Sequence, residues 1–271
     1  MWMALMGAPE TVECRMYSDW KFTVAVNITP LHYSVVMSTV DWTAWHPQPV
    51  EPDAGGLRQR KKRLLRQRLS DTATEMFLER GFDAVRVSEI AQVCGVSEKT
   101  VFNYFPTKES LVLDRGETTL ASLRAGLADT DHSPVEVALR ILFDELRAMT
   151  SWIAAQDDPH QAAVTIRRFG ALTRSTPSLR AYHQDMTDRL VTVAAEALAQ
   201  RTHREPDDPE PQIAATALLG LWSIQFQSLG KNLDGSRTPT QIHEAVTADV
   251  GRAAKLIDTG LASLEDAAPT R

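Results

Sequence analysis

Cysteine and long apolar stretches are both scarce in this 271-residue chain. Its two cysteines, Cys14 and Cys94, lie far apart without CxxC or Cys/His spacing, so the sequence supports neither a disulfide framework nor a zinc site. No run approaches the roughly 18 apolar residues of a membrane span. The first residues lack the basic start and apolar run of a secretory signal. These absences favour a soluble protein of the reducing cytoplasm.

Catalytic motifs are also missing. There is no GxSxG, no glycine-rich phosphate loop, no HExxH and no recognisable pairing of a nucleophile with a base. We therefore expect no enzyme, and neither a cofactor nor a metal is expected. Hydrophobic residues make up 43% and charged residues 24%, which is typical of a folded globular chain, and the length favours two domains.

Basic charge is concentrated in one segment, although the net charge is −6. Residues 57–115 hold twelve Lys/Arg and eight Asp/Glu, a net of +4, which leaves −10 for the rest of the chain. Because association with a charged partner depends on local fields rather than on the total, this segment is the candidate for a nucleic-acid contact.

The N-terminal 56 residues read as an extension. The strand-like segments KFTVAVNI and LHYSVV alternate enough for a hairpin, but two isolated strands are marginal without a sheet, so disorder is the preferred interpretation. Met37 opens a shorter reading frame, which makes residues 1–36 a possible start-site artefact.

Helical periodicity begins at Leu57 and continues to the end of the chain, which predicts an all-α fold. A first helix ends at Gly81, a glycine suited to a helix C-terminus. Short helices follow at 87–94 and 97–104, joined by a turn at Gly95, with Ser97 as N-cap. A fourth helix capped by Thr107 is expected to start at Lys108 and to run towards residue 127, bridging two domains. Further helices are predicted at 134–156, 160–174, 177–201, 212–229 and 241–264.

The segment GFDAVRVSEIAQVCGVSEKTVFNYFPTKESLV resembles the N-terminal domain of the tetracycline-repressor (TetR) family. The likeness covers about fifty residues without a gap, and the later helices match the family only in order and size. It implies a three-helix helix-turn-helix DNA-binding domain over residues 57–115 and a helical ligand-binding and dimerisation domain over 116–271. A second short helix after a glycine turn is also, on physical grounds, the element that enters the DNA major groove.

Candidate DNA contacts come from the outward side of this motif. Lys99 is able to donate to guanine, Glu98 to accept from cytosine, and the Thr100 methyl to touch thymine. The resemblance places these three at base-reading positions and Phe102, Asn103, Tyr104 and Lys108 nearer the phosphates, although Asn103 has the chemistry to bracket adenine. The full set of predicted contacts is Arg60, Lys61, Lys62, Arg86, Ser97, Glu98, Lys99, Thr100, Phe102, Asn103, Tyr104 and Lys108.

Two departures from the family pattern bear on affinity. Family members often carry Thr where this chain has Arg86, and Tyr where it has Phe102, so one hydroxyl contact is lost and an arginine contact is gained.

The basic arm (Arg58, Arg60, Lys61, Lys62, Arg63 and Arg66) suits phosphates or the minor groove. A solvated helix start or a membrane-surface patch is the alternative for the arm, and a structural helix corner without DNA is the alternative for the motif. Cys94 is interpreted as a small buried hydrophobe rather than a redox sensor.

The predicted effector pocket consists of large side chains of the second domain, because ligand sites are mostly apolar with a few polar groups. The candidates are Phe143, Leu146, Trp152, Phe169, Tyr182, His183, Trp222 and Phe226, each with ordinary core packing as its alternative. The stretch RRFGALTRSTPSLRAYHQDM is loosely similar to TetR-family domains that bind acyl-CoA-like ligands, in which case Arg167 and Arg168 would meet phosphates; a solvated arginine pair is the alternative. The last two helices are expected to pair with a second copy.

Three hypotheses follow, in order of preference. The first is a ligand-responsive homodimeric repressor that releases a palindromic double-stranded DNA operator when an apolar or acyl-CoA-like small molecule binds. The second is a structural DNA-binding dimer without a ligand. The third is a helical small-molecule-binding protein with an incidental basic segment.

Overall fold

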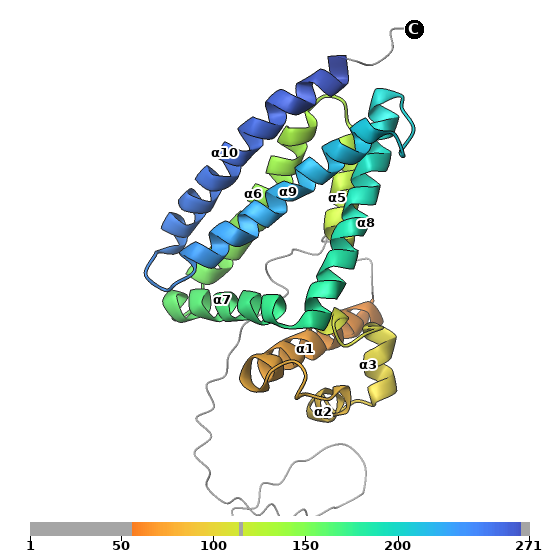
Figure 1. Ribbon diagram of the computed structural model, residues 1–271. Helices are drawn as coiled ribbons and strands as arrows, with labels where there is room; N and C mark the ends of the chain where they lie inside the picture. Colours follow the sequence, from red (N-terminus) through yellow and green to blue (C-terminus); the bar gives the residue numbers. More distant parts are fainter. Residues whose placement is uncertain (1–55, 114–115, 267–271) are drawn as a thin grey trace, which may run out of the picture. The chain divides into compact units, whose positions relative to one another are not determined.

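The computed structural model describes residues 56–113 and 116–266 (Figure 1). Every regular element in these ranges is a helix, which confirms the predicted all-α fold. The expected N-terminal hairpin or disorder falls on residues 1–55, outside the described residues. Among the described helices, none is long and apolar enough to cross a membrane.

Four helices form the first part of the described chain: α1 (Leu57–Arg80), α2 (Val87–Val93), α3 (Glu98–Tyr104) and α4 (Ser110–Leu113). Helix α1 ends as predicted at Gly81, which has a φ of +85° and donates its N–H to the Phe77 carbonyl at 2.9 Å. Glycine occupies this position without steric cost. Helix α4 begins two residues later than predicted. Thr107 and Ser110 exchange hydrogen bonds of 3.1 and 3.2 Å between side chain and backbone, so Ser110 takes the first helical position.

Six longer helices follow: α5 (Gly116–Ala128), α6 (Pro134–Ala154), α7 (Pro159–Ser175), α8 (Pro177–Thr202), α9 (Pro209–Asn232) and α10 (Pro239–Asp266). The last five all begin at a proline, whose fixed φ and missing N–H suit the first helical position. Caps reinforce these starts. Ser133 and Glu136 form a reciprocal capping box at α6, and Asp158 accepts from the Gln161 N–H at 3.0 Å at α7. The predicted bounds are met within a few residues.

Two apolar cores organise the helices. The first lies among α1–α4, where the fully enclosed side chains are Leu69, Ala73, Phe77, Ile90 and Val101. It includes Cys94, which is 4% exposed and lies 3.4 Å from the Thr72 hydroxyl, in agreement with its interpretation as a buried small residue. The second core is built from α5–α10. In Figure 1, α5, α6, α8, α9 and α10 run along one another, and α7 lies crosswise at their lower end.

The corner between α7 and α8 joins the two cores. Leu179, at the start of α8, is completely buried and belongs to the first core, although it lies far along the chain from α1–α4. Arg168 of α7 donates to the carbonyl of Leu78 in α1 at 3.1 Å. The sequence predicted a bridge only through the fourth helix. The structure adds this second connection. The predicted bridge through the fourth helix depends on residues 114–115, which join α4 to α5 and lie outside the described ranges.

Candidate nucleic-acid interface

The turn between α2 and α3 is shaped by Gly95, which has a φ of +66°. The Val96 N–H donates to the Ala91 carbonyl at 2.9 Å, and the Gly95 N–H donates to the Gln92 carbonyl at 3.1 Å. This pair of bonds is a Schellman motif, which closes a helix through one left-handed residue. At the start of α3, Ser97 Oγ accepts from the Thr100 N–H at 3.1 Å. The turn thereby sets the angle between the two helices.

The inner side of α3 is locked by apolar contacts. Val101 and Phe105 are 0% and 2% exposed and pack in the same core as Ile90 and Ala91. Arg66 of α1 reinforces the end of α3, because its guanidinium lies 4.4 Å from the Phe105 ring centre and donates to the Tyr104 carbonyl at 2.6 Å. Burial lowers the pKa of Arg66, and the residue, expected in the basic arm, has a structural contact instead.

The outer side of α3 presents polar groups to solvent. Lys99 and Asn103 are exposed and lie one helical turn apart, each about 160° around the axis from the buried Val101. Phe102 is 43% exposed on their flank. Ser97 and Glu98 are also exposed, whereas Thr100 and Tyr104 are half-buried. The predicted base-reading and phosphate residues of α3 therefore share one surface, with Lys99 and Asn103 at its centre.

An ion pair anchors α2 beside this surface. Glu89 accepts from the backbone N–H of Arg86 at 2.7 Å and from the Arg80 guanidinium at 2.8 Å. The backbone hydrogen bond and then the Arg80 contact lower the pKa of Glu89. The Arg86 side chain is exposed at the start of α2, where a phosphate contact was predicted.

Lys108 is engaged inside the domain. Its ammonium donates to the Phe82 carbonyl at 2.6 Å and lies 4.3 Å from the Phe82 ring centre. Desolvation lowers the pKa of Lys108. An ammonium has three donors, so the predicted phosphate contact remains a prediction that uses the other two. The remaining arm residues, Arg58, Arg60, Lys61, Lys62 and Arg63, are exposed along the first turns of α1.

The predicted pocket residues do not form one cluster. Leu146, Trp152 and Trp222 are buried in the second core, and Phe143 packs against it. Tyr182 packs instead against the core of α1–α4, and Phe169 touches both cores. His183 meets Phe226 edge-to-face with ring centres 5.9 Å apart, and Phe226 is 51% exposed. Burial lowers the pKa of His183.

Glu145 is a half-buried polar residue between α5, α6 and α9 that the sequence did not single out. Its carboxylate accepts from the Thr119 hydroxyl at 3.0 Å and from the Trp222 indole N–H at 3.2 Å. Desolvation raises the pKa of Glu145 to about 7. The sequence signal is faint, because a glutamate between an aspartate and a leucine in a helix resembles a solvent-exposed residue.

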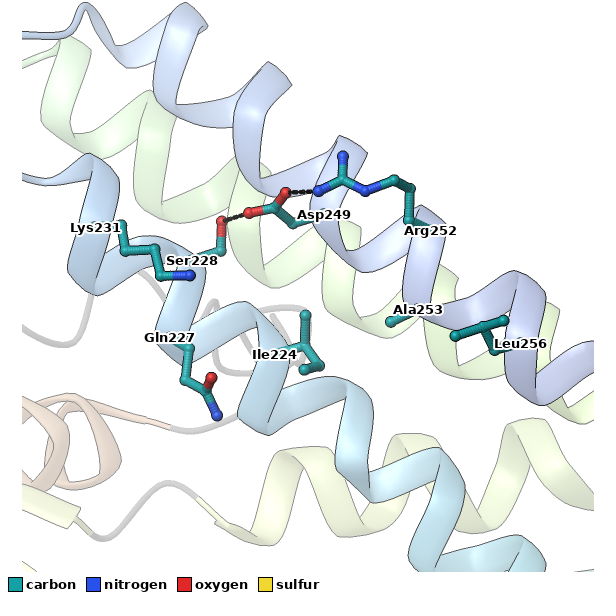
Figure 2. Close-up of a pocket in the computed structure, with 8 residues that line it drawn as sticks. All are labelled: Ile224, Gln227, Ser228, Lys231, Asp249, Arg252, Ala253 and Leu256. Atoms are coloured by element: carbon teal, nitrogen blue, oxygen red, sulfur yellow. Dashed lines mark hydrogen bonds and ion pairs between the residues drawn. The ribbon is translucent and has the colours of Figure 1, made fainter.

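A groove of about 290 Å³ is lined by residues of α9 and α10 on the outer side of their contact (Figure 2). Asp249 lies within it, where it accepts from the Ser228 hydroxyl at 2.7 Å and pairs with Arg252. The Ser228 bond lowers the pKa of Asp249. Large apolar side chains are exposed on the same two helices, since Ile213 and Phe226 of α9 and Leu256 of α10 are 66%, 51% and 81% exposed. The apolar sequence of these helices predicted that they pack most deeply, and within one chain they are buried on one side only.

The first four helices form a helix-turn-helix DNA-binding module. Residues 69–114 match the family described as bacterial regulatory proteins of the tetR family, and residues 146–248 match the MftR C-terminal domain. MftR of Mycobacterium tuberculosis, whose name assigns it to the regulation of mycofactocin biosynthesis, is 31% identical over 153 residues, covering 56% of this chain and 73% of that protein.

Two more comparisons cover different shares of the chain. The transcriptional regulator TcmR of Streptomyces glaucescens is 40% identical over 62 residues, which are 23% of this chain and 27% of that protein. The crystal structure of a TetR-family regulator from Streptomyces coelicolor A3 covers 76% of this chain and 99% of its own, at 21% identity and a TM-score of 0.43. The chain belongs to the TetR family, with a C-terminal domain of the MftR type, and it is a DNA-binding transcriptional regulator rather than an enzyme.

Proposed function

We propose that this chain is a homodimeric, ligand-responsive repressor of the cytoplasm that binds a palindromic operator and releases it when a small molecule binds. The observation that carries the proposal is the surface of α3, where exposed Lys99 and Asn103 stand on a helix locked from behind by Val101 and Phe105. A rigid helix with two central polar side chains suits direct readout in the major groove.

The dimer is supported by the exposed apolar residues of α9 and α10. Ile213 of α9 and Leu256 of α10 are each more than half exposed, while the opposite sides of these helices are buried in the second core. A second copy related by a two-fold axis would cover the same residues on both chains. Two recognition helices related by that axis would read a palindrome with half-sites about 34–36 Å apart.

The effector is proposed to be an apolar or acyl-CoA-like small molecule held in the domain of α5–α10. The connection through Leu179 and Arg168 supports a coupling between that domain and the DNA-binding domain. A ligand weakens operator binding only by the difference of its affinity for the two conformations, so operator DNA must weaken ligand binding by the same factor.

Binding-site selection with the full chain tests the DNA-binding part. The wild-type protein should select a shared palindrome from random sequences. Lys99→Ala should relax the preference at one position per half-site, at a cost of about 1–3 kcal/mol there. Lys61→Ala, in the basic arm, should weaken binding to all DNA sequences alike. It should also reduce the slope of log affinity against log salt concentration by about the amount that one phosphate contact per chain contributes. Salt-sensitive binding without a common sequence would overturn the repressor proposal in favour of a structural DNA-binding dimer.

Sedimentation of the full chain tests the dimer. The wild-type protein should sediment as a dimer, and Leu256→Asp should shift it towards the monomer because it places a charge in the apolar contact. Leu64→Asp is the matched control, since Leu64 is 57% exposed on α1. A wild-type monomer at micromolar concentration would contradict the proposed dimer.

A further inference from the structure

Helix α3 has only seven residues, Glu98–Tyr104. A helix of this length is not stable by itself in water, so its position depends on contacts with the rest of the domain. Its first turn is held by the Ser97 cap and the glycine turn. At the other end, Pro106 follows and has no N–H with which to continue the helix. The placement of this end therefore depends on contacts from other helices.

Arg66 of α1 makes such a contact. It donates to the Tyr104 carbonyl at 2.6 Å, and its guanidinium lies 4.4 Å from the ring centre of Phe105. Carbonyls in the last turn of a helix have no intrahelical donor, and the helix dipole favours a cation there. One planar guanidinium thus satisfies the last carbonyl of α3 and packs on the ring of the next residue. The main chain and the adjoining core side chain are held together.

Arg66 differs from the other cations of the basic arm. It is half-buried, whereas the exposed members of the arm are Arg58, Arg60, Lys61, Lys62 and Arg63. Tyr182 of α8 packs against the same core and acts electrostatically on Arg66. Burial lowers the pKa of Arg66, but an arginine remains charged at neutral pH. The cation is thus directed into the domain, at the end of α3.

The end of α3 carries two of the predicted DNA contacts. Asn103 is exposed, Tyr104 is half-buried, and they are the last two residues of the helix. Lys99 lies one turn earlier, near the capped end. A displacement of the C-terminal end would therefore move Asn103 and Tyr104 more than Lys99. Hydrogen bonds to base edges require restricted distances and angles, so such a displacement would weaken readout at this end first.

We propose that Arg66 is a positioning residue of the DNA interface: it holds the C-terminal end of α3 so that Asn103 and Tyr104 reach the DNA, and it does not itself bind a phosphate. This inference rests on the proposed readout by α3 and goes beyond it by assigning a residue of α1 to base preference. Arg66 then determines which sequence is bound, whereas the exposed cations of the arm determine how strongly every sequence is bound.

Binding-site selection and DNA titration with the full chain test this role. Arg66→Met keeps an apolar stem beside Phe105 and removes the donor. The affinity for the selected sequence should fall about tenfold, because a charge-assisted hydrogen bond is lost. Base preference should relax at the position that Asn103→Ala also relaxes, and remain at the position assigned by Lys99→Ala. The slope of log affinity against log salt concentration should stay unchanged, because no phosphate contact is removed.

Hydrogen exchange measures the position of α3 without DNA. In Arg66→Met, amide exchange at residues 103–105 should accelerate about two- to tenfold relative to residues 90–94 of α2. Arg66→Lys keeps a cation and one donor but not the planar fork, so it should accelerate exchange less and lower DNA affinity about threefold. A lysine would retain a phosphate contact in full. If Arg66→Met fails to fold, Arg66→Lys therefore separates the two roles.

Ser70→Ala is the matched control for a purely structural role. Ser70 lies one turn after Arg66 on α1, is 8% exposed, and donates to the Leu111 carbonyl at 2.8 Å. The variant removes a comparable bond from α1 to a main-chain carbonyl, but that carbonyl belongs to α4. Base preference and exchange at residues 103–105 should match those of the wild-type protein.

Three results would overturn the proposal: wild-type behaviour of Arg66→Met, a lower salt slope with intact base preference in Arg66→Met, or an equal loss of preference in Ser70→Ala. Each of these leaves the readout by wild-type α3 in place. A wild-type protein that selects no common sequence would instead refute the proposed readout, and that failure is visible before any variant is compared.

Discussion

The guanidinium of Arg168 in α7 donates a 3.1 Å hydrogen bond to the backbone carbonyl of Leu78 in the last turn of α1. The carbonyl belongs to the helix that carries the basic arm, and the arginine belongs to the domain of α5–α10. Such a bond satisfies a carbonyl at a helix end, where no intrahelical partner is available. It gives the two domains a polar connection in addition to their apolar contacts.

Removal of this bond should loosen the end of α1. In Arg168→Ala, we expect amide exchange at residues 76–80 to accelerate about two- to tenfold, because one hydrogen bond contributes about 0.5–1.5 kcal/mol. Hydrogen exchange with mass spectrometry measures this directly. Arg167→Ala, at the exposed neighbouring position, is the control and should leave the exchange unchanged. Equal protection in both variants would show that the bond contributes nothing in solution.

Truncation of the buried corner residue should destabilise the DNA-binding domain. Leu179 is fully buried in the core of α1–α4, so Leu179→Ala should lower the free energy of unfolding by about 2–5 kcal/mol. Leu64→Ala, at a 57% exposed position of α1, should change it by less than about 0.5 kcal/mol. Urea denaturation of the full chain compares the two. A small effect of Leu179→Ala would mean that α8 does not enter this core in solution.

The glycine turn of the DNA-binding motif should tolerate asparagine better than alanine. Gly95 has a φ of +66°, and no atom lies within 4 Å of the position that a Cβ would take, so the penalty comes from the backbone alone. We expect Gly95→Ala to cost about 1–2 kcal/mol and Gly95→Asn less, since asparagine adopts this conformation more readily. Thermal denaturation ranks the two variants. The reverse order would contradict the Schellman geometry.

The stability of the protein should depend on the ionisation of Glu145. Its pKa is raised from 4.5 to about 7 in the folded state, so the folded protein binds a proton more tightly than the unfolded chain. The contribution of this group to the free energy of unfolding is therefore largest below about pH 4.5. That contribution is lost as the pH rises to about 7, and the loss is at most about 3 kcal/mol. Glu145→Gln should remove this part of the pH dependence and stabilise the protein at about pH 8.

Urea denaturation at several pH values, with Glu196→Gln as the control, measures the difference between Glu145→Gln and wild type. That difference should grow with pH between about 5 and 7. A constant difference across this range would show that Glu145 titrates normally.

Much of the helical architecture is predictable because the signals are local. The five helices from α6 to α10 all start at proline, and Gly81 ends α1 through its own backbone conformation. The start of α4 differs from the prediction because Thr107 and Ser110 share their hydrogen bonds, and either a start at Lys108 or at Ser110 fits the sequence.

The candidate DNA-binding residues are also largely local in origin. Alternation of buried and exposed positions over two turns of α3 is enough to bring Lys99 and Asn103 outward. The placements of Arg66 and Lys108 could not be predicted in this way. Each of these cations contacts an aromatic ring and a carbonyl from another part of the domain, so charge alone suggested solvent or phosphate.

By itself, the sequence determined the helices, their approximate limits and which side of α3 is exposed, because each depends on residues within one or two turns. Only the tertiary structure decided that Leu179 completes the DNA-binding core, that Tyr182 packs there, and that Glu145 lies among uncharged donors. These contacts join residues from separate helices. They follow from how the helices pack against one another, which the periodicity of any single helix does not specify.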